Sequence, residues 1–452
     1  MSEGGLGAPE RHPIPWQEES FYDKAALDAE TRRIFDICHG CRRCFNLCSS
    51  FPRLFDLIDN SESGELDSVD SKDFPPIIDA CTLCDMCFMT KCPYVPPHEF
   101  NLDFPHLMLR HRAVLAREGK APSFVAGELA KIDRNGRLFA PIAFLVNFFT
   151  ARGLRPVRKI MEWVASIDAR VVLPRFSAKP FTKWAQKAMK KGVFVRKKRA
   201  KMKRKALIYT SCITEYNAPE MGKAAVSLLS HLGVEVELAY PECCGMPILE
   251  QGRLSEVAEK AEKISAALSE KIKQGFEVTT LTASCGLMLK QEWALLLPED
   301  ENVALLAEAT KDITEYVVDI ARKEGLPEGM RPIAGGVGVH LACHARAQNM
   351  GPKAFELVKL LPDTEASVVE RCSGHGGTFG VLKPTHELAV KNGKPAARMV
   401  EKTKAGTLVS ECPLAAKHLG QLVEDDTNKK LAIAHPVELM AKSYGLLEEK
   451  NG

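Results

Sequence analysis

The chain contains the stretch Cys38-His-Gly-Cys41-Arg-Arg-Cys44-Phe-Asn-Leu-Cys48 and, further on, the stretch Cys81-Thr-Leu-Cys84-Asp-Met-Cys87-Phe-Met-Thr-Lys-Cys92-Pro93. In each stretch three cysteines are separated by two residues, and a fourth follows after three or four residues. A two-residue gap lets a short loop wrap around one cubane, so that three thiolates reach three irons of the same cluster. The two stretches therefore predict two [4Fe–4S] clusters.

The fourth cysteine of each stretch is expected to bind the other cluster, as it does in two-cluster ferredoxins. By this rule one cluster is held by Cys38, Cys41, Cys44 and Cys92, and the other by Cys81, Cys84, Cys87 and Cys48. The chain departs from the usual pattern twice, because Ser49 replaces proline after the first stretch and one additional residue precedes Cys92. The alternative is a pair of structural zinc sites, but zinc prefers ligands in two pairs, so the triple spacing favours cubanes.

The composition excludes several other classes of protein. The chain has 452 residues, 45% hydrophobic and 26% charged, which suits two to four globular domains and not a disordered chain. Its 61 Lys and Arg residues are balanced by 58 Asp and Glu residues, which argues against a nucleic-acid partner, and its odd total of 15 cysteines argues against a disulfide framework. No apolar stretch has the length of a spanning helix, and residues 1–17 lack a signal-peptide pattern, so we expect a cytoplasmic protein.

The surroundings of the two cysteine stretches indicate helices. Apolar residues recur at three- and four-residue steps in Ala25–Ile37 and in Phe100–Arg117. Between the stretches, residues 56–73 carry seven carboxylates, for which a solvated loop is favoured over a docking patch for a basic partner. This part of the chain resembles the helical ferredoxin domains of respiratory dehydrogenases more than the small β-rich ferredoxins.

The middle of the chain is first apolar and then basic. Leu138–Phe149 is strongly apolar, and Arg152, Arg155, Arg158 and Lys159 follow it; residues 183–205 then carry 12 cations in 23 residues. An in-plane membrane contact is the favoured interpretation, with the cations meeting anionic head groups. An internal helix pair followed by a solvated basic linker is the alternative, and a nucleic-acid patch has no other support in the chain.

The C-terminal half indicates a duplicated α/β unit. A strand at Ala206–Tyr209 leads to Cys212, a helix and a second strand lead to the Cys243-Cys244-Gly245 segment, and a third strand leads to Cys285. The same order returns at Cys343, Cys372 and Cys412, at offsets of 131, 128 and 127 residues. Near-constant offsets indicate a duplication, and the carboxyl ends of parallel strands are where such sheets place their sites.

The motif Cys212…Cys243-Cys244-Gly245…Cys285 resembles the cysteine-rich CCG domain of heterodisulfide reductase catalytic subunits. Behind the two ferredoxin-like stretches, it makes the chain similar to the CCG-domain iron–sulfur oxidoreductase family, which includes the C subunit of anaerobic glycerol-3-phosphate dehydrogenase. The full motif ends in C-x-x-C, but Met288 and Ala415 stand at the last position here, and Arg371 replaces the first cysteine of the second pair. The five-thiolate site of the heterodisulfide enzymes is therefore incomplete.

The resemblance implies metal in both repeats. The first repeat offers four thiolates, Cys212, Cys243, Cys244 and Cys285, for an iron–sulfur cluster or zinc. The second repeat offers only three, Cys343, Cys372 and Cys412, and His344 or His375 would complete its shell; a vestigial site is the alternative. For both histidines the role of a polar loop residue also stays open.

The sequence thus predicts an α+β multidomain protein, with a helical ferredoxin-like domain followed by a duplicated α/β CCG domain. We expect an N-terminal arm at residues 1–30, the ferredoxin-like domain at 31–130, an apolar then basic linker with a membrane contact at 131–205, and the two CCG repeats at 206–330 and 331–452. No dinucleotide-binding glycine motif precedes a helix, so substrate oxidation is assigned to a partner. The expected role is an electron-transfer subunit that passes electrons from a flavoprotein dehydrogenase to membrane quinone, peripheral on the inner face of the membrane; the alternative is a heterodisulfide-reductase-like thiol–disulfide oxidoreductase.

Overall fold

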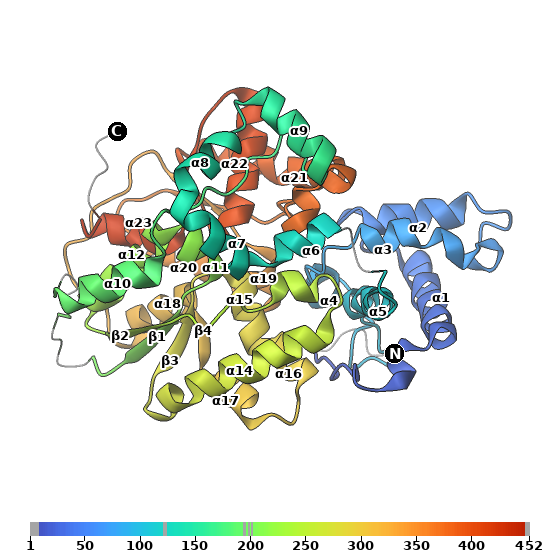
Figure 1. Ribbon diagram of the computed structural model, residues 1–452, viewed down its shortest axis with the longest axis horizontal. Coiled ribbons are helices and arrows are strands. Elements are labelled where there is room, and N and C mark those ends of the chain that lie inside the picture. Colours follow the sequence, from blue (N-terminus) through green and yellow to red (C-terminus); the bar gives the residue numbers. More distant parts are fainter. Residues whose placement is uncertain (1–8, 121–123, 193–195, 198, 200–201, 448–452) are drawn as a thin grey trace.

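The computed structural model describes residues 9–120, 124–192, 196–197, 199 and 202–447 (Figure 1). Helices coloured blue form one end of the molecule, and two parallel sheets with their covering helices form the other end. Part of the predicted N-terminal arm (residues 1–8) and part of the predicted basic run (residues 193–195, 198, 200 and 201) lie outside the described residues.

The N-terminal part is helical, and both helices expected from the sequence are present with slightly different ends. Asp23 caps the first of them by accepting a 2.6 Å hydrogen bond from the amide of Ala26, and Asp103 caps the helix that follows the second cysteine stretch in the same way. The aromatic core includes Phe51 against Phe104, with ring centroids 4.8 Å apart. The helices are α1 (Lys24–Cys41), α2 (Ser50–Asp59), α3 (Pro75–Asp79), α4 (Met86–Thr90) and α5 (Phe104–Arg117), with short 3-10 turns at Glu19–Tyr22, Leu66–Ser68 and Ser71–Asp73.

Two four-stranded parallel sheets confirm the predicted duplication. The first sheet has the order β2-β1-β3-β4 and the second has the order β6-β5-β7-β8, so the two repeats share one topology. The strands of the first sheet are β1 (Lys205–Tyr209), β2 (Glu235–Ala239), β3 (Glu277–Thr280) and β4 (Thr310–Asp312). The strands of the second sheet are β5 (Val337–His340), β6 (Ala366–Val369), β7 (Thr407–Ser410) and β8 (Ala432–Ala434).

Helices cover both sheets, as parallel sheets require. Those of the first repeat are α11 (Cys212–Tyr216), α12 (Pro219–Leu232), α13 (Met246–Leu249), α14 (Leu254–Lys273), α15 (Ala283–Leu287), the π-helical turn η5 (Met288–Glu292), α16 (Trp293–Leu296), α17 (Glu301–Ala309) and α18 (Ile313–Lys323). Those of the second repeat are α19 (Cys343–Ala347), α20 (Lys353–Lys359), the turn η6 (Gly377–Gly380), α21 (Lys383–Thr403), α22 (Pro413–Thr427) and α23 (Pro436–Ser443).

The middle segment is a set of short helices: α6 (Phe124–Ala130), α7 (Ile132–Phe139), the turn η4 (Ala140–Ile142), α8 (Ala143–Phe149), α9 (Arg155–Ala165) and α10 (Phe181–Lys190). Of these, α8 and α9 lie over the second repeat, beside α22 (Figure 1), whereas α6, α7 and α10 contact helices of the first repeat. The start of the predicted basic run is therefore not an open linker, because it lies in α10, which buries Phe181 and Ala185 against the core of the first repeat.

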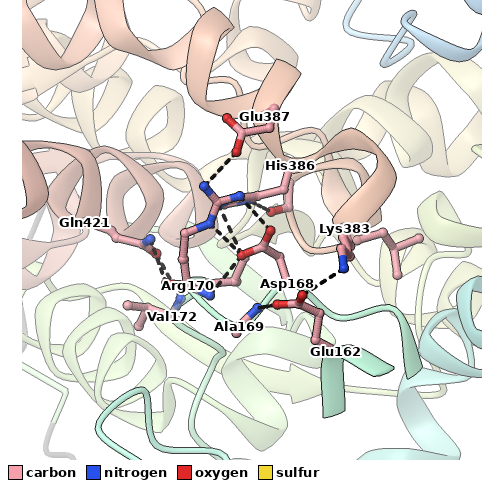
Figure 2. Close-up of polar contacts among 12 residues, drawn as sticks. Glu162, Asp168, Ala169, Arg170, Val172, Lys383, His386, Glu387 and Gln421 are labelled. Atoms are coloured by element: carbon pink, nitrogen blue, oxygen red, sulfur yellow. Dashed lines mark hydrogen bonds and ion pairs between the residues drawn. The ribbon is translucent and has the colours of Figure 1, made fainter. Parts of the chain in front are cut away.

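Polar contacts fix the chain after α9 to the second repeat (Figure 2). The Arg170 guanidinium lies between Asp168, at 2.8 Å, and Glu387 of α21, at 2.6 Å. The side chain of Gln421, from α22, accepts a 2.8 Å hydrogen bond from the amide of Val172. Arg158, one of the four cations that follow the apolar run, is fully buried and donates to the carbonyls of Asp168 and Val171, so it is not a surface cation.

Candidate functional site

The two cysteine stretches exchange their fourth cysteines in the folded chain. Cys92 lies with Cys38, Cys41 and Cys44 around one small cavity that Phe51 and Phe55 also line. Cys48 lies instead beside Cys84 and Cys81, and Cys87 has the same three cysteines around it. The structure thus brings together the two groups of four that the sequence proposed as ligand sets.

Local backbone geometry makes this exchange. Cys38 and Cys41 occupy the last turn of α1, and the helix ends at Arg42, whose φ of 54° is left-handed. In the second stretch Leu83 and Asp85 also have positive φ, which turns the chain tightly around the cysteines between them.

The electrostatics of these cysteines suit a metal cluster. Burial, followed by the charge of Cys92, raises the pKa of Cys44 to about 12, and burial raises the pKa of Cys81 to about 12 as well. Desolvated thiolates that repel one another ionise together only when a cation neutralises them, and iron–sulfur clusters are preferred partners of thiolates. Among the described residues, no group of three or more His, Cys, Asp or Glu side chains is arranged to hold a metal ion. Cys38, Cys41, Cys44 and Cys92 stand around a cavity instead.

The seven cysteines of the two repeats share one cavity. Each follows the carboxyl end of a strand, and the two sheets turn these ends toward each other, so that all seven line a cavity of about 150 Å³. Within the first repeat, the sulfurs of Cys244 and Cys285 are 3.4 Å apart, and those of Cys243 and Cys212 are 3.8 Å apart. The sequence indicates one site in each repeat. It gives no sign that the two sheets face each other and share one cavity.

Close packing of α15 against α19 holds the two repeats together. Gln348 donates a 3.0 Å hydrogen bond to the carbonyl of Ala283, and the amide of Ala283 donates to the carbonyl of Glu411 at 3.2 Å. A Cβ at Gly286 would lie 2.7 Å from the end of the Gln348 side chain, so a larger residue there would have to displace that side chain.

Cys84 connects the N-terminal cysteines with this cavity. It lines the cavity, and the thiol of Cys343 is within hydrogen-bonding reach of both Cys84 and Cys372. The contact with Cys343 lowers the pKa of Cys372 to about 7. Cysteines of the N-terminal part and of the second repeat are therefore direct neighbours.

The two histidines named from the sequence also line the cavity, but their surroundings differ. The ring nitrogens of His344 both have partners: Nδ1 is 2.8 Å from Ser284 Oγ, and Nε2 is 3.3 Å from the carbonyl of Leu83. The buried Nε2 of His375 has no partner in the structure. Burial lowers the pKa of His375 to about 3, so its ring is neutral at pH 7.

A buried charge network that the sequence did not indicate joins the N-terminal arm and the N-terminal helices to the first repeat. Arg11 pairs with Asp85 at 2.7 Å, with Asp103 at 2.9 Å and with Glu292 at 3.2 Å, and its guanidinium lies over the ring of Phe88. Asp85 stands between Cys84 and Cys87, whereas Glu292 belongs to η5 of the first repeat. The N-terminal arm thus fastens the cysteine-bearing helices to the first sheet.

Comparisons with known proteins agree with this architecture. The cysteine-rich domain family called CCG matches residues 206–290 and again residues 337–419. The C subunit of anaerobic glycerol-3-phosphate dehydrogenase from Escherichia coli K12 is 27% identical over 331 residues, which cover 71% of this chain and 78% of that protein. Lactate utilization protein A from Bacillus pumilus is 30% identical over 249 residues, which cover 52% of this chain and 98% of that protein.

A third relative is matched over only part of its own length. The B subunit of fumarate reductase (CoM/CoB) from Methanothermobacter marburgensis is 27% identical over 242 residues, which cover 52% of this chain and 46% of that protein. Among solved structures, a glutamate racemase from Bacillus anthracis overlaps 54% of this chain with a TM-score of 0.25 and 14% identity, a similarity too low to relate the two folds.

The fold and the shared cavity define a class of protein with a duplicated, cysteine-rich α/β domain whose cysteines converge at the facing ends of two parallel sheets. Within that class, the chain belongs to the CCG-domain family of iron–sulfur proteins, whose members include subunits of multi-subunit oxidoreductases.

Proposed function

We propose that the protein is an electron-relay subunit that carries electrons between a flavoprotein dehydrogenase and membrane quinone. The observation that carries this proposal is the continuous series of cysteines from the surface of the N-terminal helices to the cavity between the sheets. The group of Cys38 lines a separate cavity of the N-terminal part. The group of Cys84 adjoins the cavity between the sheets, where Cys343 contacts Cys84. Iron–sulfur clusters bound in such a series would accept and donate single electrons and so form an electron path through the protein.

The protein's own residues give each cluster a protein environment. Cys38, Cys41, Cys44 and Cys92 hold one [4Fe–4S] cluster, and Cys81, Cys84, Cys87 and Cys48 hold the other. The amide of Leu83 donates to the sulfur of Cys81 at 3.5 Å, and the amide of Gly374 donates to the sulfur of Cys372 at 3.3 Å. Such hydrogen bonds stabilise the more negative, reduced state of a cluster and so adjust its reduction potential.

The test begins with anaerobically purified full-length protein, its iron and sulfide content, and its EPR spectra during a reductive titration. We expect about eight irons from the two N-terminal clusters. Cys48→Ser should change the same EPR signal as Cys84→Ser and leave the signal that Cys38→Ser removes. If Cys48→Ser matches Cys38→Ser, the exchanged ligand sets are wrong.

The same preparation separates electron relay from the second candidate function. The cavity of about 150 Å³ lined by seven cysteines also suits a small disulfide, which supports a heterodisulfide-reductase-like oxidoreductase as the alternative. With a reduced viologen as donor, the relay protein should reduce a water-soluble quinone analogue and leave small disulfides intact. Disulfide reduction at a comparable rate without a further subunit favours the alternative.

An apolar face supports the membrane side of the proposal. We give this name to the exposed apolar side chains of α7, η4, α8 and α9, which are nine of the fifteen large ones exposed among the described residues: Leu138, Ile142, Phe144, Leu145, Phe148, Phe149, Ile160, Trp163 and Val164. Phe144 and Trp163 are 81% and 86% exposed, which is unusual for residues without a partner surface. In the described part of the chain no helix has both the length and the apolar character needed to cross a bilayer, so we propose that this face lies in the plane of the membrane surface.

A further inference from the structure

The second repeat lacks a thiolate at the position where the first repeat has Cys244. Cys372 contacts Cys343 as Cys243 contacts Cys212, so Ser373, and not Arg371 as the sequence suggests, stands at the position without a cysteine. Three cysteines remain, Cys343, Cys372 and Cys412, and all three line the cavity. A four-ligand metal centre in this repeat therefore needs a donor from another position.

His375 offers a nitrogen donor in the loop that carries Cys372. It follows Cys372 by three residues in a loop whose glycines, Gly374, Gly376 and Gly377, all have positive φ, which coils the chain back beside the cysteine. The ring lines the same cavity as the three cysteines, and its buried Nε2 has no hydrogen-bond partner. A buried, unpartnered ring nitrogen costs free energy unless something fills its lone pair, so its position requires an explanation.

The other histidine of the cavity does not have this property. Both ring nitrogens of His344 are already within hydrogen-bonding distance of Ser284 and of the Leu83 carbonyl. The loop of His375 is also held in place by dense packing, because a Cβ at Gly374 would lie 2.0 Å from the carbonyl of Ala389. The structure therefore distinguishes two histidines that the sequence could not rank.

We propose that His375 is the fourth ligand of an iron–sulfur cluster that Cys343, Cys372 and Cys412 would bind in the cavity at the second repeat. The inference rests on the proposed function as an iron–sulfur protein. It makes the two repeats unequal, with four thiolates in the first and three thiolates plus one neutral imidazole in the second. Replacing thiolate by imidazole raises the reduction potential of iron–sulfur centres, so the second repeat should hold the higher-potential centre of the cavity.

A second histidine supplies the competing explanation. The rings of His375 and His418 are 5.9 Å apart between centroids, and the Nε2 of His418 also has no partner. A buried water between the two rings would satisfy both nitrogens without any metal. The two explanations differ in whether a cysteine at position 375 can replace the histidine.

The test compares His375→Gln, His375→Cys, His344→Gln and Cys372→Ala in anaerobically purified full-length protein. Iron and zinc per chain are measured, with pulsed EPR for nitrogen coupling to the paramagnetic centres. We expect His375→Gln to lose the same metal as Cys372→Ala together with the nitrogen coupling, His375→Cys to keep the metal without the coupling, and His344→Gln to keep both. The N-terminal clusters should stay in all four variants, so their absence from the wild type contradicts the proposed function and not the ligand assignment.

Three results overturn the inference. Full metal content and unchanged coupling in His375→Gln exclude the ring as a ligand. Loss of metal in both His375→Gln and His375→Cys identifies a packing role, as expected for the water-bridged pair. No metal loss in Cys372→Ala shows that the second repeat holds no metal centre.

Discussion

Arg11 is the residue on which the joint between the N-terminal helices and the first repeat depends most. Its guanidinium is buried among Asp85, Asp103 and Glu292, and the Coulombic attraction of these carboxylates raises its pKa well above the ordinary value although burial opposes this. Removing one partner of a buried charge network leaves the others uncompensated, which typically costs about 3–5 kcal/mol. We expect Arg11→Met to lower the free energy of unfolding by about this amount, measured by urea unfolding at pH 7.5.

An exposed arginine gives the matched control for this prediction. Arg117 pairs with Glu19 at the surface, where solvent screens the interaction. Arg117→Met should therefore leave the urea transition almost unchanged. Equal effects of the two substitutions would show that the buried network of Arg11 contributes no more than a surface ion pair.

His435 predicts how the stability of the second repeat depends on pH. The residue is buried at the start of α23, where its Nδ1 accepts a 3.2 Å hydrogen bond from the amide of Val437, and burial lowers its pKa to about 3. In the unfolded chain this histidine has a pKa near 6.5 and is protonated below that pH, whereas in the folded chain it stays neutral down to about pH 3. The free energy of unfolding is therefore highest above pH 6.5 and falls as the pH decreases toward 3. At pH 5.5 the free energy of unfolding is lower than at pH 8 by roughly 1.4 kcal/mol because of this residue.

Asparagine separates the titration of His435 from its capping role, because it caps helices well but does not titrate. Relative to wild type, His435→Asn should gain about 1.4 kcal/mol of unfolding free energy between pH 8 and pH 5.5. Urea unfolding of both proteins at the two pH values measures this difference. A difference that does not change with pH would contradict a neutral, buried histidine.

At the scale of the element, the glycine loop after β6 shapes the cavity and predicts a position-dependent cost. Gly374 has a φ of 77°, and a Cβ there would meet the backbone of α21. Gly275 has a similar φ of 87° but open space around it, so alanine costs only the left-handed conformation, about 1 kcal/mol. Gly374→Ala should lower the free energy of unfolding by more than Gly275→Ala and should also reduce the metal content of the second repeat.

Urea unfolding and metal analysis of the two glycine variants check this expectation. Because both residues share the left-handed conformation, their difference isolates the crowding at α21. Similar losses of stability together with unchanged metal content would mean that the loop adapts without disturbing the cavity.

The predictable elements of this fold are those with local signals. The apolar pattern predicts the strand before Cys212 at Ala206–Tyr209 and the next helix at Ala218–Leu232, each within one residue of β1 and α12. The fourth strands, β4 and β8, were missed. Each has only three residues, and Thr310–Asp312 is polar in sequence although Thr310 and Asp312 are buried.

The features of the site that escaped prediction depend on contacts between distant parts of the chain. Constant offsets revealed the duplication, but nothing in them states that two sheets face each other across one cavity. Arg11 lies 281 residues from Glu292, and no motif connects them. His344 and His375 were named as equal candidates, and only their hydrogen-bond partners distinguish them.

At the scale of the whole molecule, the apolar face and the cysteine series belong to one arrangement. Figure 1 shows α8 and α9 over the second repeat, at one side of the molecule, and the cysteine-bearing helices at one end of it. Arg152 pairs with Asp425 of α22, which ties the apolar face to the repeat beneath it. If that face meets the membrane, as proposed, an electron acceptor there would lie nearer to the second repeat than to the cysteine group of Cys38.

The last prediction concerns attachment of the full-length protein to membranes. Arg155 and Lys159 are exposed cations beside the apolar face, and each cation near an anionic surface adds roughly 1 kcal/mol, within about one Debye length. The protein should therefore co-sediment with anionic vesicles at low salt, bind more weakly at high salt, and bind neutral vesicles least. Phe144→Glu/Trp163→Glu places two charges on the apolar face and should abolish the binding that remains at high salt, because that part comes from apolar contact.

Leu115→Glu/Ile433→Glu is the control, since both residues are exposed apolar side chains outside the face. If the wild type stays in the supernatant with anionic vesicles at low salt, or if both double variants lose binding equally, the apolar face is not the attachment surface, and quinone would have to be reached through a separate membrane protein.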